Sequence, residues 1–252
     1  YMEIPFESLS LDTVKQNLDF IKESNPERLH NISLRAENLT EYGIDIYGRP
    51  MLHKLLDLLQ SYEEIHSINI PIGLCIGEIN SDILDALCRC SKLSEISLNL
   101  EAGTNRLLDL IGKPHHVEDA INVYDKLRSS NPNLYISSVF MLGLPTEGIE
   151  DIFELAKLIG ICRPDHLRCN YYICAPKHPL AKLPQINKQV REYHLKILLK
   201  QLKSTLNRRC TIEYPSISKK SRKFQRKMNI LEEINKYSPL PHHLRSNAVY
   251  IP

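Results

Sequence analysis

Two carboxylates, Glu37 and Glu101, each follow a short apolar stretch that is typical of a β-strand. Glu101 opens the turn 101–104, and a later apolar stretch ends in the turn 143–147. Carboxylates can act as general acid and base or can bind cations and hydroxyl groups, and a glycine in each turn lets a ligand approach the backbone. Because the carboxyl ends of parallel strands meet at one edge of a sheet, these positions predict a ligand site there.

The elements that must position these residues alternate between strand and helix. The repeated alternation predicts a parallel sheet with right-handed crossovers, and Ser10 and Ser81 are the expected N-caps of two of the helices. Pro71 is expected to interrupt or bend the second strand. Strands are expected over 30–36, 66–75, 95–100, 134–142 and 165–174, and helices over 11–21, 50–60, 81–90, 104–111, 117–129, 147–160 and 185–206.

Five strands are too few for a closed eight-stranded barrel, so the sequence predicts an α/β fold, a partial (β/α) TIM-like barrel with outer helices. We expect this barrel over 1–206 and a basic C-terminal extension over 207–252, with a short helix over 229–236. From 196 to 228 there are 11 Lys and Arg residues against one acid, Glu213. That excess could contact RNA phosphates, or it could be a solvated surface.

Composition narrows the class of protein. The net charge of +2 points neither to nor away from nucleic acid, and the chain has no apolar run of about 18 residues that would span a membrane. We expect no signal peptide at Tyr1. The seven cysteines are typical of reduced thiols, so a cytoplasmic protein is expected.

Common catalytic and metal-binding motifs are missing from the sequence. It contains no G-x-S-x-G, G-x-x-x-x-G-K-[ST], G-x-G-x-x-G or H-E-x-x-H motif. The pair Cys88 and Cys90 lacks zinc-site spacing, as does the pair Cys169 and Cys174. We therefore predict no metal ligands among these residues.

Four segments, in order and each at a strand end, resemble the radical S-adenosylmethionine enzymes, in particular their methylthiotransferase and cobalamin-linked branches. These segments are Arg-Ala-Glu-Asn at 35–38, Leu-Glu-Ala-Gly-Thr at 100–104, Phe-Met-Leu-Gly-Leu-Pro-Thr-Glu at 140–147 and Tyr-Ile-Cys-Ala-Pro-Lys-His-Pro-Leu-Ala-Lys-Leu-Pro-Gln at 172–185. The resemblance covers roughly 10–206 and implies a radical SAM core that binds S-adenosylmethionine.

The resemblance also implies which strand ends meet which part of that cofactor. Its methionine ammonium needs a carboxylate, its ribose and carboxylate need polar and cationic groups, and its adenine needs an apolar edge beside open backbone. The residues so implied are Glu37 for the ammonium, Glu101, Thr104 and Lys113 for the ribose and carboxylate, and Gly143, Leu144 and Pro145 for the adenine. Asn38, Gly103 and Tyr172 are implied as further cofactor-binding residues.

The family's chemistry further depends on a 4Fe-4S cluster held by a Cys-x3-Cys-x2-Cys loop. No three of the seven cysteines have this spacing. We expect the ligands upstream of Tyr1, with a degenerate chain as the alternative. The resemblance implies a transferase that uses an external electron donor and, in the cobalamin-linked branch, cobalamin. Its outcome would be methylthiolation or methylation of a tRNA, protein or peptide.

Two other hypotheses stay open at this point. One is a non-catalytic barrel that binds a partner or a nucleotide without radical chemistry. The other is an unrelated α/β barrel enzyme in which Glu37 and Glu101 serve as acid and base. Fold alone cannot separate them.

Overall fold

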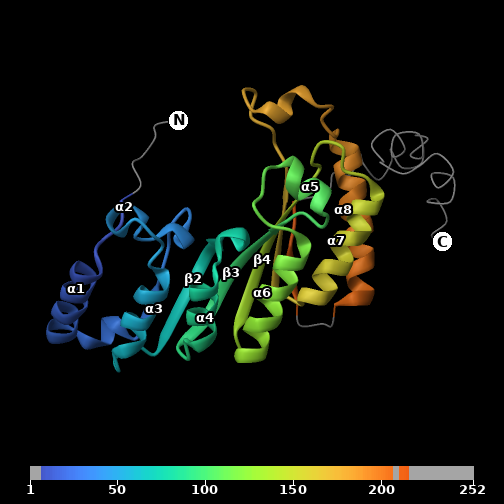
Figure 1. Cartoon of the computed structure of the whole chain (residues 1–252). Coiled ribbons are helices and arrows are strands. Elements are labelled where there is room, and N and C mark those ends of the chain that lie inside the picture. The colour runs from blue at the N-terminus through green and yellow to red at the C-terminus, as the bar shows by residue number, and fades with distance from the viewer. Residues whose placement is uncertain (1–6, 207–209, 216–252) are drawn as a thin grey trace. The chain divides into compact units, whose positions relative to one another are not determined.

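A computed structural model describes residues 7–206 and 210–215 of the chain (Figure 1). The expected helix over 229–236 lies outside the described residues, and so does nearly all of the extension 207–252. Within them the predicted alternation of strands and helices is confirmed. No helix of this part combines the length and the apolar composition that crossing a membrane requires.

The strands form one six-stranded sheet in the order β1-β2-β3-β4-β5-β6. β1 pairs in parallel with β2, β2 with β3, and β5 with β6, so the predicted parallel sheet is confirmed. The register between β2 and β3 shifts after Ile70, next to Pro71, which has no backbone N–H to donate. The strands are β1 Asn31–Ser33, β2 Ser67–Leu74, β3 Leu93–Glu101, β4 Tyr135–Leu142, β5 His166–Tyr171 and β6 Thr211–Glu213.

The predicted count of five strands was wrong by one. β6 pairs with β5 at the edge of the sheet, where Leu167 lies opposite Ile212. Three residues within a polar segment carry no recognisable alternation, so this strand could not be predicted from the sequence.

The seven helices predicted between residues 11 and 206 are all present, with shifts of a few residues at their ends. Ser10 caps the first helix as expected, because its Oγ accepts from Thr13 N at 3.1 Å. The expected cap at Ser81 was wrong: Asn80 Oδ1 accepts from Ile83 N at 2.9 Å. The helices are α1 Leu11–Ser24, α2 Ile44–Tyr47, α3 Leu52–Ser61, α4 Ser81–Arg89, α5 Asn105–Leu110, α6 Val117–Ser130, α7 Ile149–Cys162 and α8 Lys188–Thr205, of which the short α2 was not predicted.

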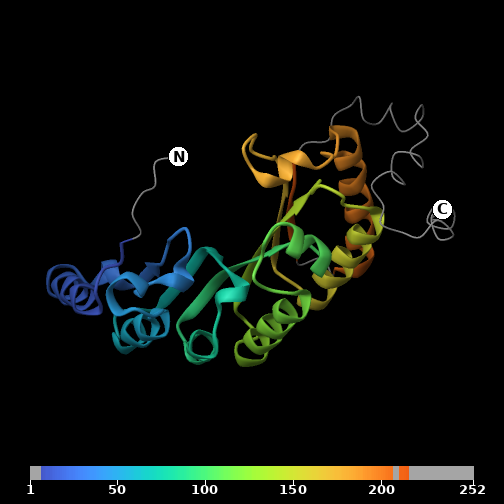
Figure 2. The same cartoon turned by 45° about the horizontal axis from the view of Figure 1, so that its top comes forward.

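The chain divides into two compact units. Unit 1 comprises 1–99 and 118–138, and unit 2 comprises 100–117 and 139–252. In unit 1, helices α3, α4 and α6 lie along one face of their strands (Figures 1 and 2). The core of unit 1 is apolar and fully enclosed, with Leu56, Ile68 and Ile83 at 0% exposure.

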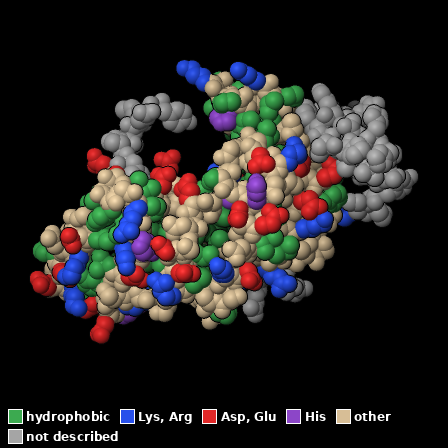
Figure 3. All heavy atoms as spheres, in the orientation of Figure 1, with side chains coloured by type: hydrophobic (Ala, Val, Ile, Leu, Met, Phe, Trp, Pro, Cys, Tyr) green, Lys and Arg blue, Asp and Glu red, His purple; other side chains and the backbone are tan. Residues whose placement is uncertain are grey.

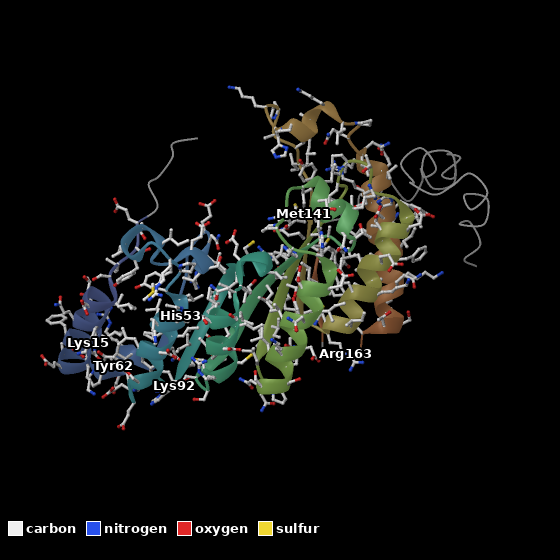
Figure 4. The ribbon with its side chains drawn as sticks, viewed as in Figure 1. Lys15, His53, Tyr62, Lys92, Met141 and Arg163 are labelled. Atoms are coloured by element: carbon white, nitrogen blue, oxygen red, sulfur yellow. The ribbon has the colours of Figure 1, made fainter. Side chains whose placement is uncertain are left out.

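Tyr62 connects α1 with the end of α3 in unit 1 through hydrogen bonds. Figure 4 shows it near Lys15 and Lys92. Its hydroxyl donates to Asp19 of α1 at 2.5 Å, and its carbonyl accepts from Lys92 Nζ at 2.5 Å. Burial, aided by the Asp19 carboxylate, raises the pKa of Tyr62 to about 12. The phenol therefore stays a hydrogen-bond donor that ties α1 to the end of α3.

In unit 2, α7 and α8 lie side by side and pack on each other (Figures 1 and 2). A smaller apolar cluster forms around α5 and the ends of β3 and β4. Its fully buried members are Ala102, Leu107, Leu108 and Leu144, and partly buried Met141 and Tyr172 pack against them. Figure 4 shows Met141 close to α5. This cluster places the two predicted turns on a fixed apolar base.

Candidate functional site

The first predicted strand end lies in unit 1, just after β1. Glu37 is exposed, and no hydrogen bond or ion pair holds its carboxylate among the residues that the structure describes. Asn38, in contrast, is held in a network: its amide donates to Glu78, and its Oδ1 accepts from Thr40 N at 3.2 Å. Thr40 Oγ1 completes the network by donating to Glu78 at 2.7 Å. Glu37 is thus open to a ligand, whereas Asn38 is occupied in holding the loop.

The second predicted strand end lies in unit 2, where β3 ends at Glu101. Its φ of 60° places a non-glycine residue in the left-handed region, a conformation that costs about 1–3 kcal/mol and persists only when the surroundings impose it. The carboxylate pairs with Lys113 Nζ at 2.8 Å, and the side chains remain 12% and 30% exposed. This strand end therefore presents a negative and a positive group together.

Lys113 reaches Glu101 because of how α5 ends. Gly112 has a φ of 69°, and its N–H donates to Asp109 O at 3.0 Å, while Lys113 N donates to Leu108 O at 2.9 Å. These two bonds form a Schellman motif, which reverses the chain direction at a helix C-terminus. The glycine is therefore what brings the ammonium group back to the strand end.

Gly103 and Thr104 face α7. A Cβ built on Gly103 would lie under 3.0 Å from backbone atoms of Leu155, so the turn 101–104 touches the helix directly. Thr104 Oγ1 donates to Asp151 Oδ1 at 2.9 Å. The residue expected at the ribose thus has its hydroxyl proton engaged, and its oxygen remains an acceptor.

Asp151 links the two predicted turns of unit 2. Its side chain is 5% exposed, and its Oδ2 accepts from Gly148 N at 2.8 Å and from Arg106 Nη2 at 2.5 Å. Arg106 also donates to Thr146 Oγ1 at 2.7 Å, and Thr146 has a φ of 65°. The sequence did not single out Asp151 or Arg106, although an acid at the third position of a helix is a recognisable capping signal.

The turn 143–147 folds back on its own carboxylate. Gly143 has a φ of 83°, and its N–H donates to Glu147 Oε1 at 2.9 Å. The helix expected from 147 begins at Ile149, so Glu147 lies outside it, buried and bonded to His194. Leu144 is at 0% exposure in the apolar cluster, and Pro145 is buried. Thr146 is the partly exposed residue of this turn, since Gly143, Leu144, Pro145 and Glu147 are all buried.

Tyr172 continues from β5 beside the same cluster. Its N–H donates to Leu142 O at 2.8 Å, which joins the ends of β4 and β5. Burial, aided by a hydrogen bond with Cys174, raises the pKa of Tyr172 to about 12. The phenol is therefore neutral at physiological pH and can donate a hydrogen bond.

The predicted contacts thus fall into two sets. Glu37 and Asn38 belong to unit 1, whereas the contacts from Glu101 to Tyr172 belong to unit 2, where Glu101 and Lys113 are joined directly. On the face drawn in Figure 3, acidic and basic side chains are interspersed. The roles of the predicted contact residues toward a ligand stay predictions.

The donor chemistry suits S-adenosylmethionine but not an iron–sulfur cluster. The pair of Glu101 and Lys113 offers groups of both signs for a ligand with an ammonium, a carboxylate and ribose hydroxyls. Within 7–206 and 210–215, no three His, Cys, Asp or Glu side chains are grouped so that they could hold a metal ion. Ligands for a 4Fe-4S cluster are therefore not supplied by this part of the chain.

Comparison with known proteins defines the class. The model of the Radical SAM superfamily matches residues 4–159. The chain belongs to the radical SAM superfamily, as the resemblance predicted.

Relatives within the superfamily include methylthiotransferases. Over 157 residues the chain is 28% identical to the ribosomal protein uS12 methylthiotransferase RimO of Symbiobacterium thermophilum, which covers 62% of this chain and 32% of the relative. It is 25% identical over 198 residues to the tRNA-2-methylthio-N(6)-dimethylallyladenosine synthase of Thermotoga petrophila, covering 76% and 44%. The chain thus spans less than half the length of these curated relatives.

Solved structures agree on the fold. Coproporphyrinogen III oxidase (HemN) from Escherichia coli, a radical SAM enzyme, superposes with a TM-score of 0.56 at 15% identity, over 76% of this chain and 46% of that one. Streptococcus suis SuiB bound to S-adenosylmethionine gives 0.52 at 12% identity, over 85% and 45%. These similarities confirm the partial barrel of the radical SAM class.

Proposed function

We propose that this chain is the cofactor-binding part of a radical SAM enzyme of the transferase type. S-adenosylmethionine, when bound, supplies methyl and 5′-deoxyadenosyl groups for radical modification. The observation that carries the proposal is the ion pair of Glu101 and Lys113 at the end of β3. Glu101 itself has its backbone in the left-handed region. Strained backbone of this kind is typical of functional sites.

Each residue has a defined task in this proposal. In unit 2, Lys113 binds the methionine carboxylate and Glu101 accepts from the ribose hydroxyls. In unit 1, Glu37 is assigned to the methionine ammonium on the family resemblance alone. The turn 143–147 receives the adenine, as the family resemblance implies. Tyr172 donates a hydrogen bond from its phenol beside the same turn. The ligands of the 4Fe-4S cluster come from outside the described residues.

The reaction we propose is methylthiolation or methylation of a macromolecule or peptide. The two named methylthiotransferases support this, since one acts on a ribosomal protein and the other on tRNA. A tRNA, a protein and a peptide therefore remain the substrate classes to test.

The decisive experiment is calorimetric titration of S-adenosylmethionine into the chain and into Glu101→Gln. A hydrogen bond to a charged acceptor contributes about 1.5–3 kcal/mol and one to a neutral acceptor about 0.5–1.5 kcal/mol. Glutamine still accepts but lacks the charge, so the affinity should fall about fivefold or more. The matched control is Glu154→Gln, which also breaks a carboxylate–lysine pair of unit 2 (2.6 Å to Lys157) but on the exposed face of α7. It should stay within about twofold of wild type.

Two results bear on the wider proposal. Equal affinities of Glu101→Gln and wild type would remove Glu101 from the site. The radical class is tested separately, by assaying 5′-deoxyadenosine after reduction of a protein that carries the cluster-binding cysteines together with this chain, reconstituted with iron and sulfide. A protein that binds the cofactor but never yields this product would contradict the radical activity and support a binding-only role.

A further inference from the structure

Two side chains of α8, Arg191 and His194, contact the turn 143–147. They stand three residues apart, so they share one face of the helix. Neither belongs to a strand end or to a segment with recognisable motif spacing. Their contacts nevertheless concern the same turn that is proposed to receive the adenine.

His194 holds the turn through a buried pair. Its Nδ1 lies 2.7 Å from Glu147 Oε1, and the two side chains are 1% and 2% exposed. The same oxygen accepts from Gly143 N at 2.9 Å. A buried carboxylate without partners is strongly disfavoured, so the imidazole and the amide together fix where Glu147 lies. The first and last residues of the turn are thereby joined to α8 through a single oxygen atom.

Arg191 holds the turn through packing and one hydrogen bond. A Cβ on Gly143 would fall under 3.0 Å from the methylene carbons of Arg191, so the arginine stem occupies the space where a side chain would point. Its Nη1 donates to Tyr172 O at 2.9 Å, and its guanidinium carbon lies 5.3 Å from the centre of the Tyr171 ring. One side chain thus connects the turn after β4 with the end of β5.

We propose that Arg191 and His194 are positioning residues that fix the turn 143–147 in its binding conformation before the cofactor arrives. The proposal rests on the assignment of this turn to the adenine. A turn that is already ordered needs no further ordering when the ligand binds, which increases affinity. The turn needs support, because Thr146 has a φ of 65°, a conformation that a non-glycine residue keeps only when its surroundings impose it.

The test uses three variants that separate hydrogen bonding from volume. His194→Leu keeps the bulk and removes the donor, whereas His194→Asn keeps a donor near the position of Nδ1. Arg191→Met keeps the stem and removes the bond to Tyr172 O. Hydrogen–deuterium exchange of 143–148 is measured by mass spectrometry on the full chain, with α6 as internal reference, and affinity for S-adenosylmethionine is measured by calorimetry.

We expect exchange in the turn to accelerate about tenfold or more in His194→Leu, to recover in His194→Asn, and to accelerate in Arg191→Met while α6 stays unchanged. Affinity should follow the same order. If His194→Leu unfolds as a whole, Arg191→Met decides the matter, because it leaves the pair of Glu147 and His194 intact. Unchanged exchange in the turn of a folded variant would overturn the proposal, and so would His194→Asn behaving like His194→Leu.

The proposed cofactor site can fail without affecting this test. A wild-type chain that does not bind S-adenosylmethionine would contradict the assignment of the site. The exchange data would still show whether α8 fixes the turn.

Discussion

Substitution of Gly103 by alanine should destabilise unit 2 sharply, and the reason is geometric. The added Cβ would lie under 3.0 Å from backbone atoms of Leu155, so either α7 or the turn 101–104 must move. Overpacking of this kind costs about 1–3 kcal/mol. Because the obstacle is backbone and not the end of a flexible side chain, we expect the upper value, about 3 kcal/mol. For a chain of this size that corresponds to roughly 6–12 °C in melting temperature.

Gly160→Ala supplies the matched control. Gly160 lies in α7, the helix that Gly103 contacts. A Cβ on Gly160 would come equally close to another atom, but that atom is the terminal methyl of Thr205. Thr205 ends α8 and can rotate away, and alanine favours a helix over glycine by about 1 kcal/mol. The net change should therefore stay within about 1 kcal/mol. Urea denaturation midpoints, compared at equal slope, measure both variants. Wild-type stability of Gly103→Ala, or equal losses in the two variants, would refute the close approach of turn and helix.

Three further predictions concern stability. Tyr124→Phe removes a buried hydrogen bond to Ser138, so we expect a loss of about 1–3 kcal/mol, and an unchanged urea midpoint would contradict it. Burial raises the pKa of the Cys162 thiol to about 12, so from about pH 9 to 12 the unfolded state loses this proton first and the free energy of unfolding falls. Cys162→Ala should flatten that part of the pH curve, and an equal slope would count against it. Asn80→Ala should cost about 1 kcal/mol and Ser81→Ala under about 0.5, because Asn80 is the cap; equal thermal shifts would disprove this.

The architecture was predictable because it depends on local patterns. Apolar runs bounded by turn residues located five strands, and helical spacing located seven helices. The predictions were wrong where the sequence carries no local pattern for an element, or where two neighbouring residues fit the same role. β6 is three residues long, and both Asn80 and Ser81 are good caps, so only the hydrogen bond to Ile83 separates them.

The site was predictable only in part, for a related reason. Strand ends and glycine turns can be recognised from adjacent residues, and these gave Glu101 and Gly143. The residue pairs that hold these turns in place are distant in sequence: Arg106 and Asp151 are 45 residues apart, and His194 and Glu147 are 47 residues apart. One sequence alone carries no local pattern for such pairs. They depend on the packing of α5, α7 and α8, which only the folded chain shows.

Burial separates the residues that can bind a ligand from those that hold the turns. The side chains of Glu101 and Lys113 are 12% and 30% exposed, so this pair is more open to a ligand than the pair of Glu147 and His194. The pair of Glu147 and His194 is enclosed, and leaving a buried polar group without its hydrogen-bond partner costs about 1–3 kcal/mol, and more where the group is charged. A ligand that displaced it would have to overcome that loss. We therefore propose that Glu101 and Lys113 contact the ligand directly, while Glu147 keeps Gly143 in place.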